Sequence, residues 1–146
     1  MSTAVRAIII ENDQILVMRR NKQTSDYYTL VGGVVKGGET AEQGLVREVQ
    51  EETGVVISSS RLVFIEEHPA PYNRQLIFIC DVEPHQAVSI QEYSEEAMLN
   101  KLDFNTHQPI WVKLSNFSHL PFRTPQLQIA INSAVRDGFP QQPTNL

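Results

Sequence analysis

Three glutamates, Glu48, Glu51 and Glu52, have the residue type and the spacing of a metal-binding helix face. Glu48 and Glu52 are four residues apart, so on a helix their carboxylates lie one above the other, on the same stripe as the apolar Leu45. A carboxylate on a core-facing stripe is strongly destabilised unless it is paired or bound to a metal. An acid-rich helix is more often only a solvated face, but the apolar periodicity argues against that here. We therefore predict a site for a hard divalent cation, Mg²⁺ first and Mn²⁺ as the alternative.

The carboxylates must be positioned by a helix that follows a glycine-rich loop. Four glycines fall within residues 32–38, which predicts a loop whose backbone takes positive φ and approaches another group closely. Thr40 is the expected N-cap, and Gln43 completes a capping box. Gly54 is suited to the left-handed conformation that ends a helix. The sequence thus predicts a loop followed by a helix between Thr40 and Gly54.

The loop and the helix resemble the Nudix box, the motif of the MutT-like Nudix hydrolases, over residues 33–55. The residue before the two glycines is often Pro in that family and is Val31 here, which changes the stiffness of the loop and leaves the chemistry intact. The positions that match the family consensus are Gly33, Glu39, Arg47, Glu48, Val49, Glu51, Glu52, Gly54 and Val55.

The resemblance implies Mg²⁺-dependent hydrolysis of a nucleoside diphosphate that is linked to another group. Glu48, Glu51 and Glu52 would be metal ligands, and the backbone carbonyl of Gly32 matches a position that joins the metal shell in relatives. Gly33 would contact the substrate. In such a reaction a divalent cation polarises the phosphoryl oxygens and can hold the attacking water.

Arg47 and Glu39 complete the predicted catalytic face. Arg47 lies four residues before Glu51, close enough on a helix to orient one carboxylate but not to neutralise three. We expect it to point to the other side of the helix, and we count it among the catalytic residues. Glu39 matches the box position that supports the geometry of loop and helix, so its predicted role is structural.

The general base is not fixed by the motif. Some relatives place it on a glutamate in the loop before the last strand, and the long polar segment before the last expected strand offers Glu92, Glu95 and Glu96. Glu96 is our first choice and Glu95 the next, although any one of them taken alone is more simply a solvated loop charge. Glu51 or Glu52 of the helix would serve instead, as in other relatives.

A basic cluster precedes the glycine loop and includes Arg19, Arg20 and Lys22. It is either a solvated loop end or a phosphate contact, and the residues alone do not decide between the two. Relatives often carry an Arg at the end of the second strand that contacts a ligand phosphate. The resemblance therefore predicts that Arg20 binds the substrate.

The identity of the substrate is less well defined. Subfamilies are marked by a residue at a set distance after the box, Pro for ADP-ribose hydrolases and Tyr for dinucleoside polyphosphate hydrolases, and here Pro71 and Tyr72 conflict. Because the chain is short, we expect a nucleoside or deoxynucleoside triphosphate that yields a monophosphate and pyrophosphate. ADP-ribose or a nucleotide sugar is the alternative. A non-catalytic nucleotide-binding Nudix module is the alternative of another class, but such modules commonly lose a box carboxylate and this chain keeps them all.

Length and composition indicate one ordinary globular domain. The chain has 146 residues and a net charge of -5, and we expect a Nudix domain at 1–140 and a tail at 141–146. The negative charge argues against partners such as nucleic-acid polymers or membranes and leaves a small-molecule nucleotide as the expected partner. The first apolar run is too short for a signal peptide, which favours a cytoplasmic location. For the oligomeric state, both a monomer and a homodimer are compatible with the sequence.

The remaining pattern predicts several strands and a second helix. Residues 58–60 are expected to be a linker, and Thr124 opens a final helix that ends near Gly138, with an apolar stripe from Leu127 to Val135. This order suits an α/β fold of the Nudix kind, an α/β/α sandwich with a mixed β-sheet between helices. The expected strands are 4–10, 15–18, 27–31, 61–67, 76–80 and 109–114.

Overall fold

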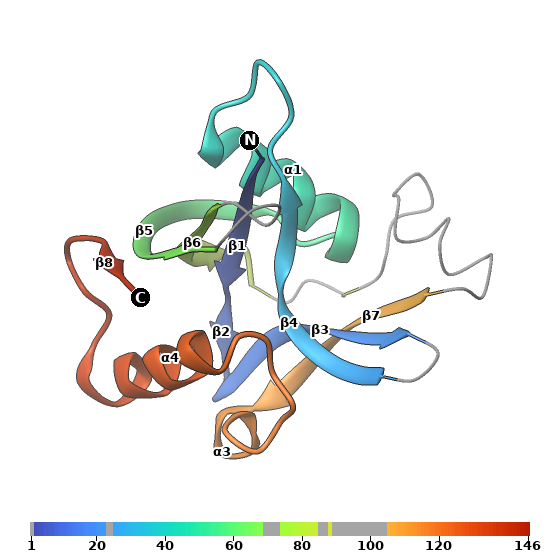
Figure 1. The fold of residues 1–146 in the computed structure, drawn as a ribbon, viewed down its shortest axis with the longest axis vertical. Helices are drawn as coiled ribbons and strands as arrows, with labels where there is room; N and C mark the ends of the chain where they lie inside the picture. The colour runs from blue at the N-terminus through green and yellow to red at the C-terminus, as the bar shows by residue number, and fades with distance from the viewer. Residues whose placement is uncertain (1, 23–24, 69–73, 85–87, 89–104) are drawn as a thin grey trace.

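The computed structural model describes residues 2–22, 25–68, 74–84, 88 and 105–146. Within these residues the chain forms a mixed sheet of eight strands, in the order β2-β3-β4-β1-β6-β5-β8, with β7 paired to β3 (Figure 1). The elements are β1 (Thr3–Ile8), β2 (Ile10–Glu11), β3 (Gln14–Lys22), β4 (Ser25–Val34), α1 (Ala41–Thr53), β5 (Ile57–Glu67), β6 (Arg74–Val82), β7 (Asn105–Lys113), α3 (Leu114–Phe117), α4 (Pro125–Asp137) and β8 (Thr144–Asn145).

Strand β4 connects the two halves of the sheet. Its first residues pair antiparallel with β3, where Tyr27 lies opposite Arg20. Its last residues pair antiparallel with β1, where Gly33 lies opposite Val5. Strand β1 in turn pairs parallel with β6, which makes the sheet mixed. The C-terminal end of β4 leads into the loop before α1 (Figure 1), so this one strand links the glycine loop to the β3 pairing.

The two long helices cover opposite faces of the sheet. Leu45 and Val49 of α1 pack with one set of buried strand residues, which includes Val5. Leu127 and Ile131 of α4 pack with the other set. Successive residues of a strand point to opposite faces, so the same strands supply both cores. This arrangement confirms the predicted α/β/α sandwich with a mixed sheet between helices.

Both long helices begin at the residues that the sequence predicts. Thr40 caps α1, because its hydroxyl accepts the Gln43 N–H at 3.1 Å and the Gln43 side chain accepts the Thr40 N–H at 2.9 Å. Gly54 ends α1 with a φ of 77°. Thr124 caps α4, whose first residue is Pro125. These contacts satisfy backbone groups that a helix end leaves without partners. In the parts of the chain that the structure describes, every helix is too short or too polar to cross a bilayer.

Strand β5 corrects the prediction of a linker at 58–60. These serines lie inside β5, which pairs antiparallel with β6 and places Ser59 opposite Asp81 and Ser60 opposite Cys80. Ser59 also donates its hydroxyl to the Asp81 carboxylate at 2.8 Å. A run of small polar residues resembles a turn when it is taken alone. Here the backbone of β6 supplies the partners that hold the run extended, so tertiary context overrides the local preference.

The C-terminal end of the chain also differs from the expected tail. Residues 144–145 form β8, which runs parallel to β5, and the Leu146 N–H donates to the Ile65 carbonyl at 2.9 Å. Strand β7 is therefore not the last strand. Val135, predicted on the buried stripe of α4, is 38% exposed. The eighth residue after Leu127 is rotated by about 80° from it around the helix, which takes Val135 off the buried face.

Candidate active site

Glu48 and Glu52 face the interior of the protein, as their place on the α1 stripe predicts. Their exposed fractions are 9% and 1%, whereas Glu51 beside them is half-buried. One carboxylate oxygen of Glu52 accepts the backbone N–H of Gly32 at 2.8 Å. Helix α1 is thereby tied to the end of β4 by a buried, charge-assisted hydrogen bond, which is stronger than one between neutral groups.

The two glycines at the end of β4 allow this close packing. A Cβ atom added to Gly33 would lie 2.5 Å from the carboxylate carbon of Glu48, well inside ordinary contact distance. Gly32 has a φ of 145°, which side chains rarely adopt, and a Cβ there would meet the backbone of Val5 and come within 3.0 Å of the Arg6 Cα. The Glu48 carboxylate therefore occupies the space that any other residue at position 33 would fill.

Arg47 corrects the expectation that it points away and orients a single carboxylate. Its Nε donates to Glu39 at 2.6 Å, and its terminal nitrogens donate to Glu48 at 2.9 Å and to Glu51 at 3.3 Å. A further bond runs to the Val34 carbonyl at 3.3 Å. The planar guanidinium has several donors in a fixed fork, so one side chain can connect the loop, the helix and β4.

Glu39 holds the glycine loop to the helix. Its carboxylate accepts two bonds from Arg47 and also the backbone N–H of Lys36, at 2.8 Å. The Arg47 hydrogen bonds, with help from the Lys36 N–H, lower the pKa of Glu39 to about 2. Burial opposes the charge of Arg47, but its bond to Glu39 dominates and raises the pKa of the guanidinium. The contacts agree with the structural role predicted for Glu39.

The carboxylates of this face suit a hard cation whose remaining ligands come from a substrate and from water. The Arg47 guanidinium bonds three of the carboxylates, those of Glu39, Glu48 and Glu51. Among the described residues, no three His, Cys, Asp or Glu side chains converge on one point to hold a metal unaided. Mg²⁺ is usually bound by one or two carboxylates together with waters and phosphate oxygens, so the donor set fits it.

The carbonyl of Gly32, predicted as a further metal ligand, has a protein partner. Arg6 donates to this oxygen at 3.1 Å, from a guanidinium that also donates its Nε to the Gln75 side chain at 3.0 Å. A carbonyl oxygen has two lone pairs and can accept a second partner. The role of Gly32 toward a metal therefore stays a prediction, and the structure adds Arg6 as a charged neighbour of the site.

A cavity of about 520 Å³ lies along β4 and is lined by residues from both ends of that strand. Arg6 and Val34 line the end near the box, and both are tied to it, because Arg6 bonds the Gly32 carbonyl and Arg47 bonds the Val34 carbonyl. Tyr27 lines the cavity from the other end of β4. The cavity is therefore linked to the box through Arg6 and the backbone of β4, although none of the helix carboxylates lines it.

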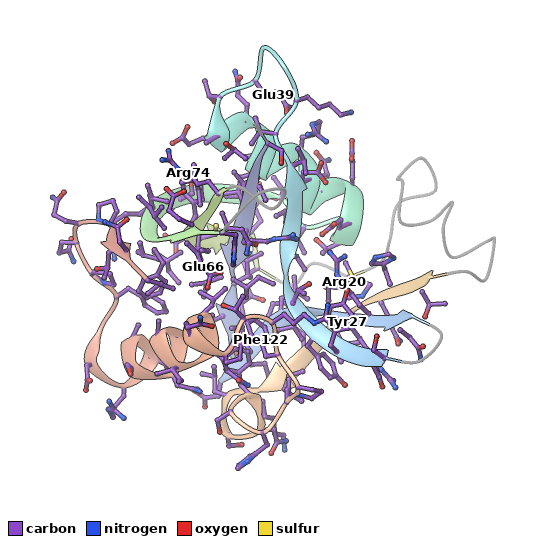
Figure 2. The ribbon with its side chains drawn as sticks, in the orientation of Figure 1. Arg20, Tyr27, Glu39, Glu66, Arg74 and Phe122 are labelled. Atoms are coloured by element: carbon purple, nitrogen blue, oxygen red, sulfur yellow. The ribbon has the colours of Figure 1, made fainter. Side chains whose placement is uncertain are left out.

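Basic side chains line this cavity from five separate parts of the chain, and we call it the basic cavity. Of these residues the sequence predicted only Arg20, whose Nε donates to the Thr29 hydroxyl at 3.1 Å. The others share no spacing or motif that could have marked them, because the fold brings them together from β1, β5, β6 and the segment before α4. Figure 2 labels Arg20 and Arg74. The basic residues are Arg6, Arg20, Arg74, Arg123 and His68.

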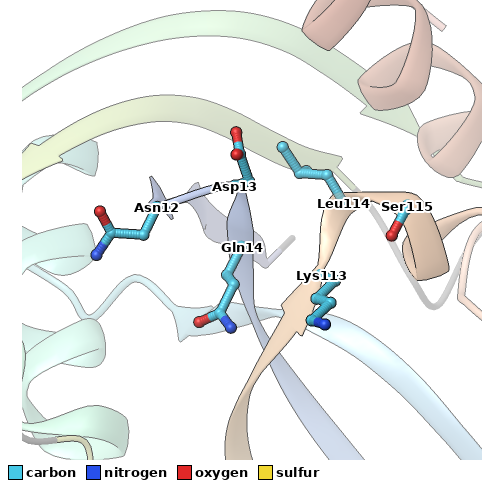
Figure 3. Close-up of a pocket in the computed structure, with 6 residues that line it drawn as sticks. All are labelled: Asn12, Asp13, Gln14, Lys113, Leu114 and Ser115. Atoms are coloured by element: carbon cyan, nitrogen blue, oxygen red, sulfur yellow. The ribbon is translucent and has the colours of Figure 1, made fainter.

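A second hollow, of about 510 Å³, lies away from the box residues. It is formed by the turn at Asn12 and Asp13, which both have positive φ, and by the junction of β7 with α3 at Lys113 (Figure 3). None of the box carboxylates lines it. Unlike the basic cavity, it has no residue that bonds the glycine pair, so it is a separate hollow from the predicted site. Glu96, predicted as general base, and its neighbour Glu95 lie outside the described residues.

The family model of the NUDIX domain matches residues 1–130 of this chain. The chain belongs to the NUDIX domain family. The match covers both the box helix α1 and the sheet that carries the basic cavity, so the NUDIX domain accounts for most of the described fold.

Individual relatives and solved structures agree with the family. The NAD-capped RNA hydrolase NudC of Photobacterium profundum is 32% identical over 83 residues, which are 57% of this chain and 31% of that protein. MutT from Aliivibrio salmonicida and Vibrio cholerae has a TM-score of 0.66 at 19% identity, covering 94% of this chain and 98% of the other. An ADP-ribose pyrophosphatase from Streptococcus suis has a TM-score of 0.63 at 16% identity, covering 99% and 98%. At these identities the structures support the fold alone. The chain spans about a third of the length of the first curated relatives that it matches.

Proposed function

We propose that this protein is an Mg²⁺-dependent pyrophosphohydrolase that cleaves the phosphoric anhydride of a nucleoside diphosphate linked to another group. The observation that carries the proposal is the pair of buried carboxylates, Glu48 and Glu52, packed against Gly33 and Gly32 at the end of β4, the strand that also lines the basic cavity. Buried like charges next to a cationic cavity favour a ligand set of one divalent cation and one polyphosphate.

The residues of the site have separate roles in the proposed reaction. Glu48, Glu51 and Glu52, with the carbonyl of Gly32, would hold the cation, which when bound polarises phosphoryl oxygens and lowers the pKa of a water. Arg47 keeps two of these carboxylates in place. A general base takes the proton of the attacking water, and the leaving phosphate departs with the bonding electron pair as the new P–O bond forms.

We assign the role of general base to Glu96 first. Glu51 and Glu52 are the alternatives on the helix. Gly33 and Arg20 are the proposed contacts of the substrate, Gly33 from its place against the Glu48 carboxylate and Arg20 from the wall of the basic cavity.

The proposed substrate is a nucleoside or deoxynucleoside triphosphate, with ADP-ribose or a nucleotide sugar as the second candidate. The MutT structures share the fold of this chain, which is compatible with a triphosphate substrate. The name of the Streptococcus suis structure, an ADP-ribose pyrophosphatase, supports ADP-ribose as the second candidate. The curated relatives act on NAD-capped RNA, so NAD and an NAD-capped oligonucleotide belong in the test as well. A small nucleotide suits the net charge of -5, which offers no broad basic field for a polymer.

The proposal is tested by a panel of nucleotides assayed for phosphate release through a coupled phosphatase, with Mg²⁺, with Mn²⁺ and with a chelator. We expect hydrolysis of at least one nucleoside diphosphate derivative that is lost in chelator, with a nucleoside monophosphate as one product. Glu52→Gln serves as the matched inactive control, because the amide oxygen can still accept the Gly32 N–H.

A non-catalytic nucleotide-binding module is the competing function. It predicts binding of the same nucleotides by calorimetry with no product from any of them, in wild type and Glu52→Gln alike. Retention of every box carboxylate, with Glu48 and Glu52 buried, argues against it, because a module without turnover has no need to keep mutually repelling charges.

A further inference from the structure

Two arginines of the basic cavity are neighbours of Tyr27. Arg20 is opposite Tyr27 in the pairing of β3 with β4, and the Arg123 guanidinium lies 3.7 Å from the centre of the Tyr27 ring. The backbone fixes this arrangement, because the Arg123 N–H donates to the Tyr28 carbonyl at 3.0 Å and the Tyr28 N–H donates to the Pro121 carbonyl at 2.9 Å. The segment before α4 is thus held as an additional strand-like partner of β4.

The charge of this pair is not balanced by an acid in the described part of the chain. Arg20 donates to the Thr29 hydroxyl, and Arg123 rests on an aromatic face. Arg19, the neighbour of Arg20, differs from this pair because an acid balances its charge. Its guanidinium donates two hydrogen bonds to the Asp26 carboxylate, at 2.9 and 3.3 Å. Two guanidinium groups that line one cavity without an acidic partner in the described residues favour an anion in that cavity.

The acid nearest to the cavity wall is already engaged. Glu66 is 4% exposed and accepts the Thr124 hydroxyl on one oxygen. Its other oxygen accepts the Gln75 amide at 3.2 Å and lies 3.2 Å from the His68 ring nitrogen. Figure 2 labels Glu66 away from Arg20 and Tyr27, on the far side of β4. This carboxylate supports the wall and is not a counter-ion of the arginine pair.

The arginine pair is remote from the carboxylates of α1. The Arg20 Nε lies at Thr29, three residues before Gly32 on β4, and Tyr27 lies five residues before it. At about 3.3 Å per strand residue, these positions are about 10 Å and about 16 Å from the glycine pair. A charge-assisted hydrogen bond spans only about 2.8 Å, so these separations along the backbone place the arginine pair nearer to a further phosphate of the substrate than to the one attacked at the carboxylate face.

We propose that Arg20 and Arg123 form a subsite for a second phosphate, separate from the anhydride that is cleaved. This inference rests on the proposed function, because it takes the carboxylate face as the place of cleavage. The second phosphate is either an ester on the sugar or the terminal phosphate of a longer chain. Arg20 therefore recognises a remote group of the substrate and does not act on the scissile phosphates.

The test compares pairs of compounds that share the anhydride and differ by one phosphate. NADP⁺ against NAD⁺ tests a phosphate ester, and ATP against ADP tests a longer chain. In wild type we expect kcat/KM to favour the phosphorylated member of one pair by about tenfold or more, the size expected for hydrogen bonds to a charged group. That ratio should fall to about threefold or less in Arg20→Ala and in Arg123→Ala.

Arg19→Ala is the matched control, because Arg19 adjoins Arg20 but is exposed and paired with Asp26 outside the cavity. It should keep the wild-type ratio. Arg20→Lys should recover only part of it, because an ammonium lacks the guanidinium fork. Circular dichroism checks that each variant folds, and where an alanine variant does not fold, the lysine variant decides by the same ratio.

Failure of this subsite is distinct from failure of the proposed function. If no compound is hydrolysed, calorimetry with the same pairs still measures the preference for the additional phosphate, and its dependence on Arg20 and Arg123 decides the subsite. Equal kcat/KM and equal affinity within both pairs in wild type would overturn the inference. A preference that survives both alanine substitutions would overturn it as well.

Discussion

Substituting Gly33 by alanine would test whether the Glu48 carboxylate must occupy the place that the structure gives it. The added Cβ would lie 2.5 Å from the carboxylate carbon and 2.9 Å from one carboxylate oxygen, where ordinary contacts are 3.4 to 4 Å. The carboxylate must therefore move by about 1 Å. A displacement of about 1 Å in a catalytic group can lower the rate about 10²-fold, which corresponds to about 2.7 kcal/mol in the barrier.

The fold should tolerate Gly33→Ala better than the reaction does. Gly33 lacks the positive φ of Gly32, so the substitution introduces no backbone strain, and overpacking of this kind typically costs about 1 to 3 kcal/mol. Gly37→Ala is the matched control in the same loop, since a Cβ there would have no neighbour within 4 Å. It should leave kcat close to wild type.

The assay is kcat on the best substrate of the nucleotide panel at saturating Mg²⁺, together with Mn²⁺ affinity measured without substrate by electron paramagnetic resonance. We expect Gly33→Ala to lose about 10² in kcat and to bind Mn²⁺ more weakly, with a retained circular dichroism spectrum. A kcat within threefold of wild type, with unchanged Mn²⁺ affinity, would refute the packing of Glu48 against Gly33. An equal loss in Gly37→Ala would attribute the effect to the loop in general.

Three further outcomes follow. Glu52→Gln should lose most hydrolysis and weaken Mn²⁺ binding while keeping its melting temperature near wild type; near-normal turnover at saturating Mg²⁺ would contradict its metal role. Because the pKa of Glu39 is lowered from 4.5 to about 2, its ionised form stabilises the fold above about pH 4.5, and this stabilisation disappears as the pH falls toward 2. Urea unfolding of wild type and Glu39→Gln should therefore converge at low pH, and a gap that stays constant would disprove the linkage. Glu96→Gln should lower kcat at least about a hundredfold with little change in Mg²⁺ affinity, whereas a fall below threefold in it and in Glu95→Gln would return the role of base to the helix.

The box helix was predictable because its signals are local. Thr40, Gln43 and Gly54 form their caps with residues at most four positions away, and the inward stripe of Glu48 and Glu52 follows from 3.6 residues per turn. The same local reasoning failed for the serines at 58–60, whose extended conformation depends on β6, more than twenty residues further along the chain. Strand pairing of this kind is set by distant partners and not by the run itself.

The sequence by itself therefore determined the family, the fold class and the carboxylate face, because each depends on residues close together in the chain. Only the tertiary structure decided what surrounds that face. It placed Arg47 in contact with three carboxylates and packed the Glu48 carboxylate against Gly33. These contacts depend on how α1 packs against β4. It also brought Arg20 and Arg123, more than a hundred residues apart, to the wall of one cavity beside Tyr27. Such a site has no periodicity or spacing in the chain, because the register of the strands and the docking of the segment before α4 create it.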